Sequence, residues 1–133
     1  MNTSYLLGVD IGTYSSKGVL VDARTGNVLA EHSLEHTLSM PRPGWVEHDP
    51  QQTWWGEFTS ICRTLIANAG VEAKHIQGVG VSGIGPCVLP VDADGQPLRP
   101  AILYGIDTRA SQEISVLEHA LGRDDVFKHS ATH

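Results

Sequence analysis

The chain has 133 residues, a length typical of one domain, and a formal net charge of −6 that argues against a nucleic-acid-binding surface. It contains no apolar run of membrane-spanning length and no secretory signal, so we expect a cytoplasmic protein without a membrane partner. The two cysteines, Cys62 and Cys87, are typical of buried apolar positions, and no disulfide between them is expected.

The first third of the chain alternates short apolar runs with tight polar turns. The apolar runs 5–9, 17–21 and 28–37 are interpreted as strands. The turns at 10–16 and 22–27 carry glycine and small polar residues, which is typical of tight connections. Three strands joined in this way predict an antiparallel meander.

A loop and a long helix are expected next. The segment 40–47 is rich in Pro and Gly but also apolar and aromatic, which favours an ordered loop. Asp49 has the character of a helix N-cap, with Pro50 at the first helical position. Apolar residues recur at helical spacing over 54–69, and Gly70 is the expected end of the helix.

The last part of the chain predicts further strands and two short helices. The Gly-rich apolar run 76–82 is interpreted as a buried strand, and two more strands are expected over 87–91 and 101–104. The residues 92–95 supply a turn between them. A helix over 110–121 should stop at Gly122, and another short helix should begin after it. No repeat or internal domain boundary is visible.

The strongest local signal is the first turn, GVDIGTYSSK, at residues 8–17. Asp10 ends a buried strand, and a turn rich in hydroxyl groups leads from it to Lys17. Gly12 allows close backbone approach, and consecutive backbone N–H groups form an anion-binding nest in such turns. The glycine spacing excludes a P-loop and a dinucleotide fingerprint. The alternative is an ordinary hairpin turn whose Ser and Thr side chains bond to their own backbone.

Four motifs, taken in order, resemble the FGGY carbohydrate kinases, which include glycerol kinases and xylulose kinases. The resemblance covers essentially the whole chain, and four ordered motifs are far more specific than the hairpin alone. It implies an α/β fold, the ribonuclease-H-like domain of the actin-like ATPase superfamily, which has a mixed sheet with flanking helices. We expect this domain to be incomplete in the present chain. The motifs are the hairpin, GWVEHDP at 44–50, VGVSG at 79–83, and the segments 88–92 and 100–103.

The resemblance also implies a reaction, the transfer of the γ-phosphoryl group of MgATP to a sugar or polyol hydroxyl. Asp10 would handle Mg²⁺, directly or through water, because a carboxylate beside a bare phosphate would repel it. The ATP phosphates would be lined by Gly12, Thr13, Ser15, Ser16 and Lys17. The sugar would be bordered by Ser82, Gly83, Gly85, Pro86, Tyr104, Asp107 and Arg109.

The chain departs from the family pattern on the sugar side. Xylulose kinases place Met-His, and glycerol kinases Arg-Glu, where this chain has Gly85-Pro86. Tyr104 stands where many members have Trp, and one extra residue separates it from Asp107. Neither substrate is therefore supported, and we expect a pocket shaped for a different polyol or sugar.

The extent of the chain sets a further expectation. The family's general base lies downstream of the matched region and its adenine pocket lies in a second domain, so no catalytic residue is assigned here. We expect residues 1–133 to be the amino-terminal part of the FGGY amino-terminal domain, inactive alone. The alternative is a non-catalytic nucleotide- or sugar-binding protein, or an actin-like ATPase that is not a sugar kinase. The oligomeric state is open, and a homodimer is one option.

Several single residues have competing interpretations. Asp107 has the character of a helix N-cap as well as of a sugar ligand, and Arg109 of a partner for an acid at a helix start. His48, beside a cap, is interpreted as a surface residue. Trp54 and Trp55 are interpreted as core anchors rather than as a pair on which a ligand stacks.

Overall fold

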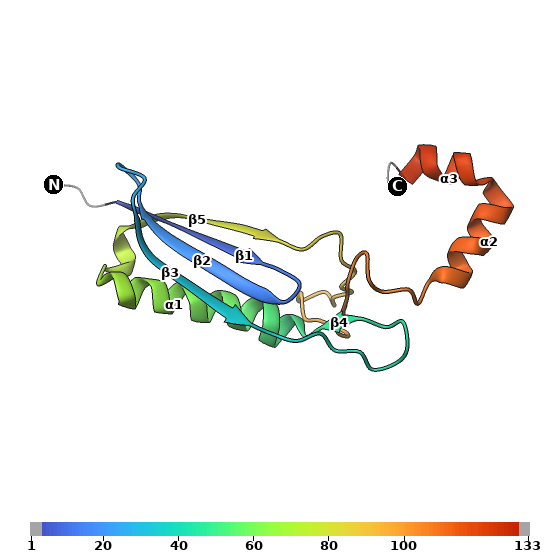
Figure 1. Ribbon diagram of the computed structural model, residues 1–133, viewed down its shortest axis with the longest axis horizontal. Helices are drawn as coiled ribbons and strands as arrows, with labels where there is room; N and C mark the ends of the chain where they lie inside the picture. Colours follow the sequence, from blue (N-terminus) through green and yellow to red (C-terminus); the bar gives the residue numbers. More distant parts are fainter. Residues whose placement is uncertain (1–3, 131–133) are drawn as a thin grey trace.

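The computed structural model describes residues 4–130, in which a four-stranded sheet packs against one long helix and two short helices follow (Figure 1). Strands β1 (Tyr5–Ile11), β2 (Ser15–Asp22) and β3 (Val28–Glu35) form the predicted antiparallel meander. Strand β5 (Ile76–Gly83) pairs with β1 in parallel, which gives the order β3-β2-β1-β5. The sheet is therefore mixed, as predicted.

The long helix begins and ends where its sequence signals predict. The Asp49 carboxylate accepts hydrogen bonds from the backbone N–H groups of Gln51 and Gln52, so Asp49 is the N-cap. The first turns, Pro50–Gly56, have the wider π-helical geometry, and α1 (Glu57–Ala69) follows directly. Gly70 ends the helix in the left-handed conformation with φ of 63°, which a glycine adopts without strain.

The hydrophobic core lies between α1 and the first three strands. Leu20 from β2 and Ile61 and Leu65 from α1 are completely buried. Gly18 lets the helix approach, because a Cβ atom there would lie 2.3 Å from Ile61 Cγ2. The helix packs mainly against β1, β2 and β3, so Val81 on β5 remains 62% exposed although it belongs to the helix-side face.

Residues 84–110 form mostly irregular structure. A two-residue ladder joins β4 (Glu47–His48) to β6 (Ala101–Ile102). The predicted strand 87–91 is wrong, because only isolated bridges form, from Val88 to Ile102 and from Val91 to Pro97. The predicted strand 101–104 is reduced to β6. The turn at 92–95 is confirmed by a hydrogen bond from Gly95 N–H to the Asp92 carbonyl oxygen.

The two final helices lie beyond the strand ends, away from the sheet and α1 (Figure 1). They are α2 (Ser111–Leu121), which stops before Gly122 as predicted, and α3 (Arg123–Ser130). Neither carries a buried residue among those whose side chains are described. Within residues 4–130, no helix is long and apolar enough to cross a bilayer. Cys62 and Cys87 are half-buried and unpaired.

Candidate active site

Three polar side chains form a row across the face of the sheet opposite α1. The strand register places Asp10 beside Lys17 on β2 and beside Ser82 on β5. All three are exposed, and the Ser82 hydroxyl donates to Asp10 Oδ1 at 2.6 Å. They line a cleft of about 430 Å³ together with the strand residues Gly8, Val9, Gly18, Val19, Gly80 and Val81. The fold therefore brings the Ser82 hydroxyl, 72 residues further along the chain, beside an acid and a cation of the first hairpin.

The charges in this cleft are not neutralised by each other. Although Asp10 and Lys17 lie on neighbouring strands, neither forms an ion pair within residues 4–130. Gly8 and Gly80 line the cleft beside them. A Cβ at Gly80 would meet nothing within 4 Å, so no side chain fills the cleft at this position. Both charges are accordingly accessible to a ligand in the cleft.

The turn between β1 and β2 connects Asp10 and Lys17, the two charged residues that line the cleft. Gly12 N–H donates to the Ser15 carbonyl oxygen at 2.9 Å, which closes a tight turn. A Cβ at Gly12 would lie 2.8 Å from that oxygen, so the turn requires glycine here. Thr13 and Ser15 are half-buried and Tyr14 is exposed.

Ser16 differs from the other predicted phosphate ligands. Because strand residues alternate between faces, Ser16 shares the buried face of β2 with Gly18 and Leu20. Its side chain is completely buried, and its hydroxyl has no hydrogen-bond partner among the described residues. The Ser16 hydroxyl thus lies on the helix side of the sheet, whereas Lys17 lies on the cleft side.

His48 is buried, with 1% exposure, so its interpretation as a surface residue is wrong. Its Nδ1 accepts the indole N–H of Trp54 at 3.1 Å, and its Nε2 lies 3.1 Å from the Thr13 carbonyl oxygen. Burial and the nearby charge of His36 lower the pKa of His48. The prediction used only the position of His48 beside a helix cap. It could not include the β1–β2 turn, which is distant in sequence and packs against this residue.

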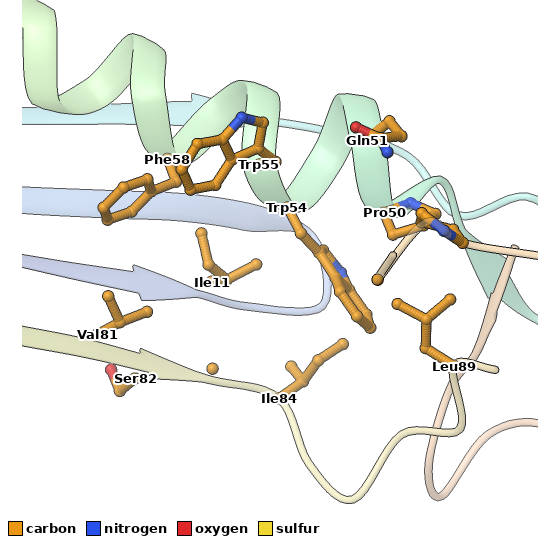
Figure 2. Close-up of a pocket in the computed structure, with 13 residues that line it drawn as sticks. Ile11, Pro50, Gln51, Trp54, Trp55, Phe58, Val81, Ser82, Ile84 and Leu89 are labelled. Carbon is orange, nitrogen blue, oxygen red and sulfur yellow. The ribbon is translucent and has the colours of Figure 1, made fainter. Parts of the chain in front are cut away.

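Ser82 and Gly83 also border an apolar groove of about 640 Å³ on the helix side (Figure 2). Trp54 reaches from the first helical turns toward Ile84 and Leu89 in this view. Trp55 is 63% exposed and stacks on Phe58 with ring centroids 5.6 Å apart. Trp54 contacts the core as predicted, but the prediction that Trp55 is a core anchor is wrong.

The other residues predicted near the sugar lie outside this groove and the cleft. Gly85 and Pro86 are joined by a cis peptide bond beyond the end of β5. Tyr104 is exposed. Asp107 and Arg109 belong instead to a cluster of charges around the loop 44–48.

This charge cluster consists of Glu47, Arg99, Asp107 and Arg109, with the ring of Trp45 beside it. Arg109 Nη2 lies 2.6 Å from Asp107 Oδ2 and 2.9 Å from Glu47 Oε1, and its guanidinium lies 4.0 Å from the centre of the Trp45 ring. Asp107 Oδ2 also accepts the backbone N–H of Val46 at 2.7 Å. The cluster thereby ties the chain near residue 107 to the loop 44–48.

The electrostatics of the cluster follow from these contacts. The hydrogen bonds from Arg109 hold the pKa of Asp107 well below its usual range, and Asp107 raises the pKa of Arg109 in return. The alternative in which Arg109 pairs with an acid is confirmed. The alternative in which Asp107 caps a helix is wrong, because Ala110 occupies the N-cap of α2 and makes no side-chain cap bond.

Residues 5–133 match the family described as the FGGY family of carbohydrate kinases, N-terminal domain. The chain belongs to the FGGY family of carbohydrate kinases. It is 37% identical over 100 residues to a glycerol kinase of Thermococcus onnurineus, which covers 75% of the chain and 20% of the relative. It is 36% identical over 112 residues to a xylulose kinase of Klebsiella pneumoniae, and the match covers 84% of the chain and 22% of that relative.

Solved structures of FGGY kinases agree with the fold. The xylulose kinase of Rhodospirillum rubrum superimposes with a TM-score of 0.81 at 33% identity, and the match covers 92% of this chain and 25% of that protein. The Plasmodium falciparum glycerol kinase solved with ADP has a TM-score of 0.77 at 22% identity, which supports the fold alone. The predicted fold class is thus confirmed. The chain spans about a fifth to a quarter of the length of these relatives.

Proposed function

We propose that the native gene product containing this chain transfers the γ-phosphoryl group of ATP to a hydroxyl group of a sugar or polyol. The observation that carries the proposal is the exposed row of Asp10, Lys17 and Ser82 beside a tight glycine turn. Membership of the FGGY family supplies the reaction class. Catalysis of phosphoryl transfer rests largely on positioning and on neutralising charge, which such a row of side chains is suited to provide.

The phosphate groups are proposed to lie over the β1–β2 turn. Gly12 allows the backbone to approach them, and the hydroxyls of Thr13 and Ser15 are donors at the same turn. Lys17 contributes a cation whose ammonium group is not used in any ion pair within residues 4–130. The Ser16 hydroxyl faces the helix, so we propose that Ser16 supports the turn by packing.

The residues of the cleft fit a magnesium–phosphate complex. One Asp10 oxygen accepts from Ser82, and the carboxylate is exposed in the cleft. No group of three or more His, Cys, Asp or Glu side chains suited to a metal ion occurs among residues 4–130. A single carboxylate is nevertheless sufficient for Mg²⁺, which commonly takes its remaining ligands from water and substrate phosphates. When bound, the ion would neutralise phosphate charge, while Ser82 orients the Asp10 carboxylate.

The sugar is proposed to lie near the end of β5. Ser82, Gly83, Gly85 and Pro86 would border it, and the glycines and the proline would do so with backbone groups alone, because they offer no side-chain donors. Arg109 would contribute a donor, because its buried Nη1 has no hydrogen-bond partner among the described residues. Asp107 would hold that guanidinium in place, and Tyr104 is exposed for contact with a ligand.

A sugar panel tests the proposed function. The purified native gene product is incubated with MgATP and a broad set of sugars and polyols, and release of ADP is measured. We expect turnover on the order of 1 per second or more with at least one of them. Binding of MgATP without turnover on any compound would favour a non-catalytic nucleotide-binding protein. ADP release that is independent of any sugar would favour an ATPase.

A further inference from the structure

Three consecutive backbone carbonyl groups of the β1–β2 turn each face a nitrogen atom of His36 or His48. The Gly12 carbonyl oxygen lies 3.2 Å from His36 Nε2, and the Thr13 carbonyl oxygen lies 3.1 Å from His48 Nε2. The Tyr14 carbonyl oxygen accepts the backbone N–H of His36 at 3.0 Å. The two imidazole rings are neighbours, with centroids 4.8 Å apart in an edge-to-face arrangement.

The direction of these carbonyls fixes the direction of the next N–H groups. In a planar trans peptide unit the C=O and the following N–H point in opposite directions. The carbonyls of Gly12 and Thr13 point toward the histidines, so the N–H groups of Thr13 and Tyr14 point away from them. Neither N–H has a partner among the described turn and loop hydrogen bonds. The turn therefore presents two adjacent N–H groups, the arrangement that binds anions.

His48 can hold its carbonyl in only one protonation state. Its Nδ1 accepts the N–H of Trp54, which is a donor only, so Nδ1 carries no proton. Nε2 therefore carries the proton and donates to the Thr13 carbonyl oxygen. The lowered pKa of His48 agrees with a neutral ring.

His36 is placed between two acceptors. Its Nδ1 lies 2.9 Å from Glu57 Oε2 at the start of α1, and its Nε2 faces the Gly12 carbonyl oxygen. Both bonds are fully satisfied when the ring carries both protons and pairs with the Glu57 carboxylate. The side chains of His36 and Glu57 are 7% and 15% exposed, so this pair is well shielded from water. The turn is thereby linked to the first turn of α1.

We infer that His36 and His48 are positioning residues that hold the Gly12 and Thr13 carbonyls away from the cleft, so that the turn presents its N–H groups to the phosphates of a nucleotide. The inference rests on the proposed function, and it assigns these two side chains a role in nucleotide affinity. Packing alone does not explain the arrangement, because an apolar ring in either place would leave a turn carbonyl without its donor.

Variants at His48 in the native gene product test the inference. His48→Leu removes the donor to Thr13, whereas the side-chain amide of His48→Gln can both donate to Thr13 and accept from Trp54. We expect His48→Leu to raise the KM for MgATP and the Kd for MgADP about 10-fold, the effect of losing one well-placed hydrogen bond. The KM for the sugar should change less than about twofold, and His48→Gln should restore both nucleotide constants to within about twofold.

A matched control and a second variant complete the test. His119→Leu changes an exposed histidine on α2 and should leave all constants unchanged. Equal impairment of His48→Leu and His48→Gln, an unchanged Kd for MgADP, or an equal rise in the sugar KM would overturn the inference. If His48→Leu does not fold, Trp54→Phe removes the N–H that fixes the His48 proton while keeping an aromatic ring at this core-packed position. It should raise the Kd about threefold, and an unchanged Kd would contradict the inference.

The outcomes separate this inference from the proposed function. If the wild-type protein binds MgADP but phosphorylates no sugar, the proposed kinase reaction fails, and the Kd values still decide the role of the histidines. If it phosphorylates a sugar and His48→Leu keeps the wild-type nucleotide constants, only the inference fails. A wild-type protein that binds no MgADP contradicts both.

Discussion

The cleft lined by β1, β2 and β5 and the charge cluster around the loop 44–48 each hold an aspartate beside a cation, with opposite consequences. In the cleft, Asp10 and Lys17 are exposed and form no ion pair within residues 4–130. In the cluster, Asp107 and Arg109 are nearly buried and bonded to each other. The unpaired side chains of Asp10 and Lys17 are available to a ligand. The paired side chains of the cluster instead hold two loops together.

The comparison implies that the cleft alone is insufficient for chemistry. Among residues 4–130, Asp10 is the only acid that lines it, and it is proposed to interact with Mg²⁺ rather than to accept a proton. We therefore expect the 133-residue chain by itself to show no sugar-dependent release of ADP from MgATP. Turnover on the order of 1 per second by the isolated chain would show that it supplies its own general base.

The exposed, unpaired Asp10 should contribute strongly to activity and little to stability. In the native gene product, Asp10→Asn should lower kcat about 10²- to 10³-fold, because charge stabilisation at the reacting phosphoryl group is lost. The melting temperature should stay within a degree or two, since the side chain is exposed. Asp94→Asn, which changes an exposed turn carboxylate, is the control. Retention of most activity by Asp10→Asn would rule out the metal role.

Asp107, which is paired with Arg109, should contribute strongly to stability. Asp107→Asn weakens a buried ion pair and should lower the free energy of unfolding by roughly 3 kcal/mol, measured by denaturant titration. Because Asp107 is proposed to hold Arg109 in place for sugar binding, kcat/KM for the sugar should also fall, with a much smaller change in the KM for ATP. Unchanged stability and sugar kinetics would remove both roles from Asp107.

The pH dependence of stability should report on the ion pair of Asp107. The pKa of Asp107 is lowered in the folded chain, so its stabilising effect is complete above the unfolded value of about 3.9. It is lost as the pH falls below that value toward the folded pKa. The melting-temperature difference between wild type and Asp107→Asn should therefore be constant from about pH 8 to 5 and shrink below about pH 4. A difference that is already shrinking at pH 6 would contradict this assignment.

Local signals predicted most of the fold. The cap at Asp49, the stop at Gly70 and the meander of β1 to β3 depend on neighbouring residues, so each could be predicted from a short stretch of sequence. The strand over 87–91 failed because a strand needs a partner. Val88 and Val91 each find only one bridging residue, and both remain exposed.

The site was less predictable because it depends on packing between distant segments. Asp10, Gly12 and Lys17 could be found from the turn that contains them. His36 had no sequence signal at all, since its partners Gly12 and Glu57 lie 24 and 21 residues away. His48 was interpreted as exposed because its neighbour is a cap, although the β1–β2 turn covers it.

Strand β5 lies at the edge of the sheet, and this has a consequence for handling the protein. Its outer backbone edge pairs with no strand in residues 4–130, and Val79 and Val81 are exposed along it. An unpaired edge with apolar side chains is a template on which a second chain adds as a further strand. Concentrated solutions of the 133-residue chain should therefore associate edge to edge and lose solubility. A lysine at Val81 would disfavour that association without touching the buried side chains of Leu20 or Ile61.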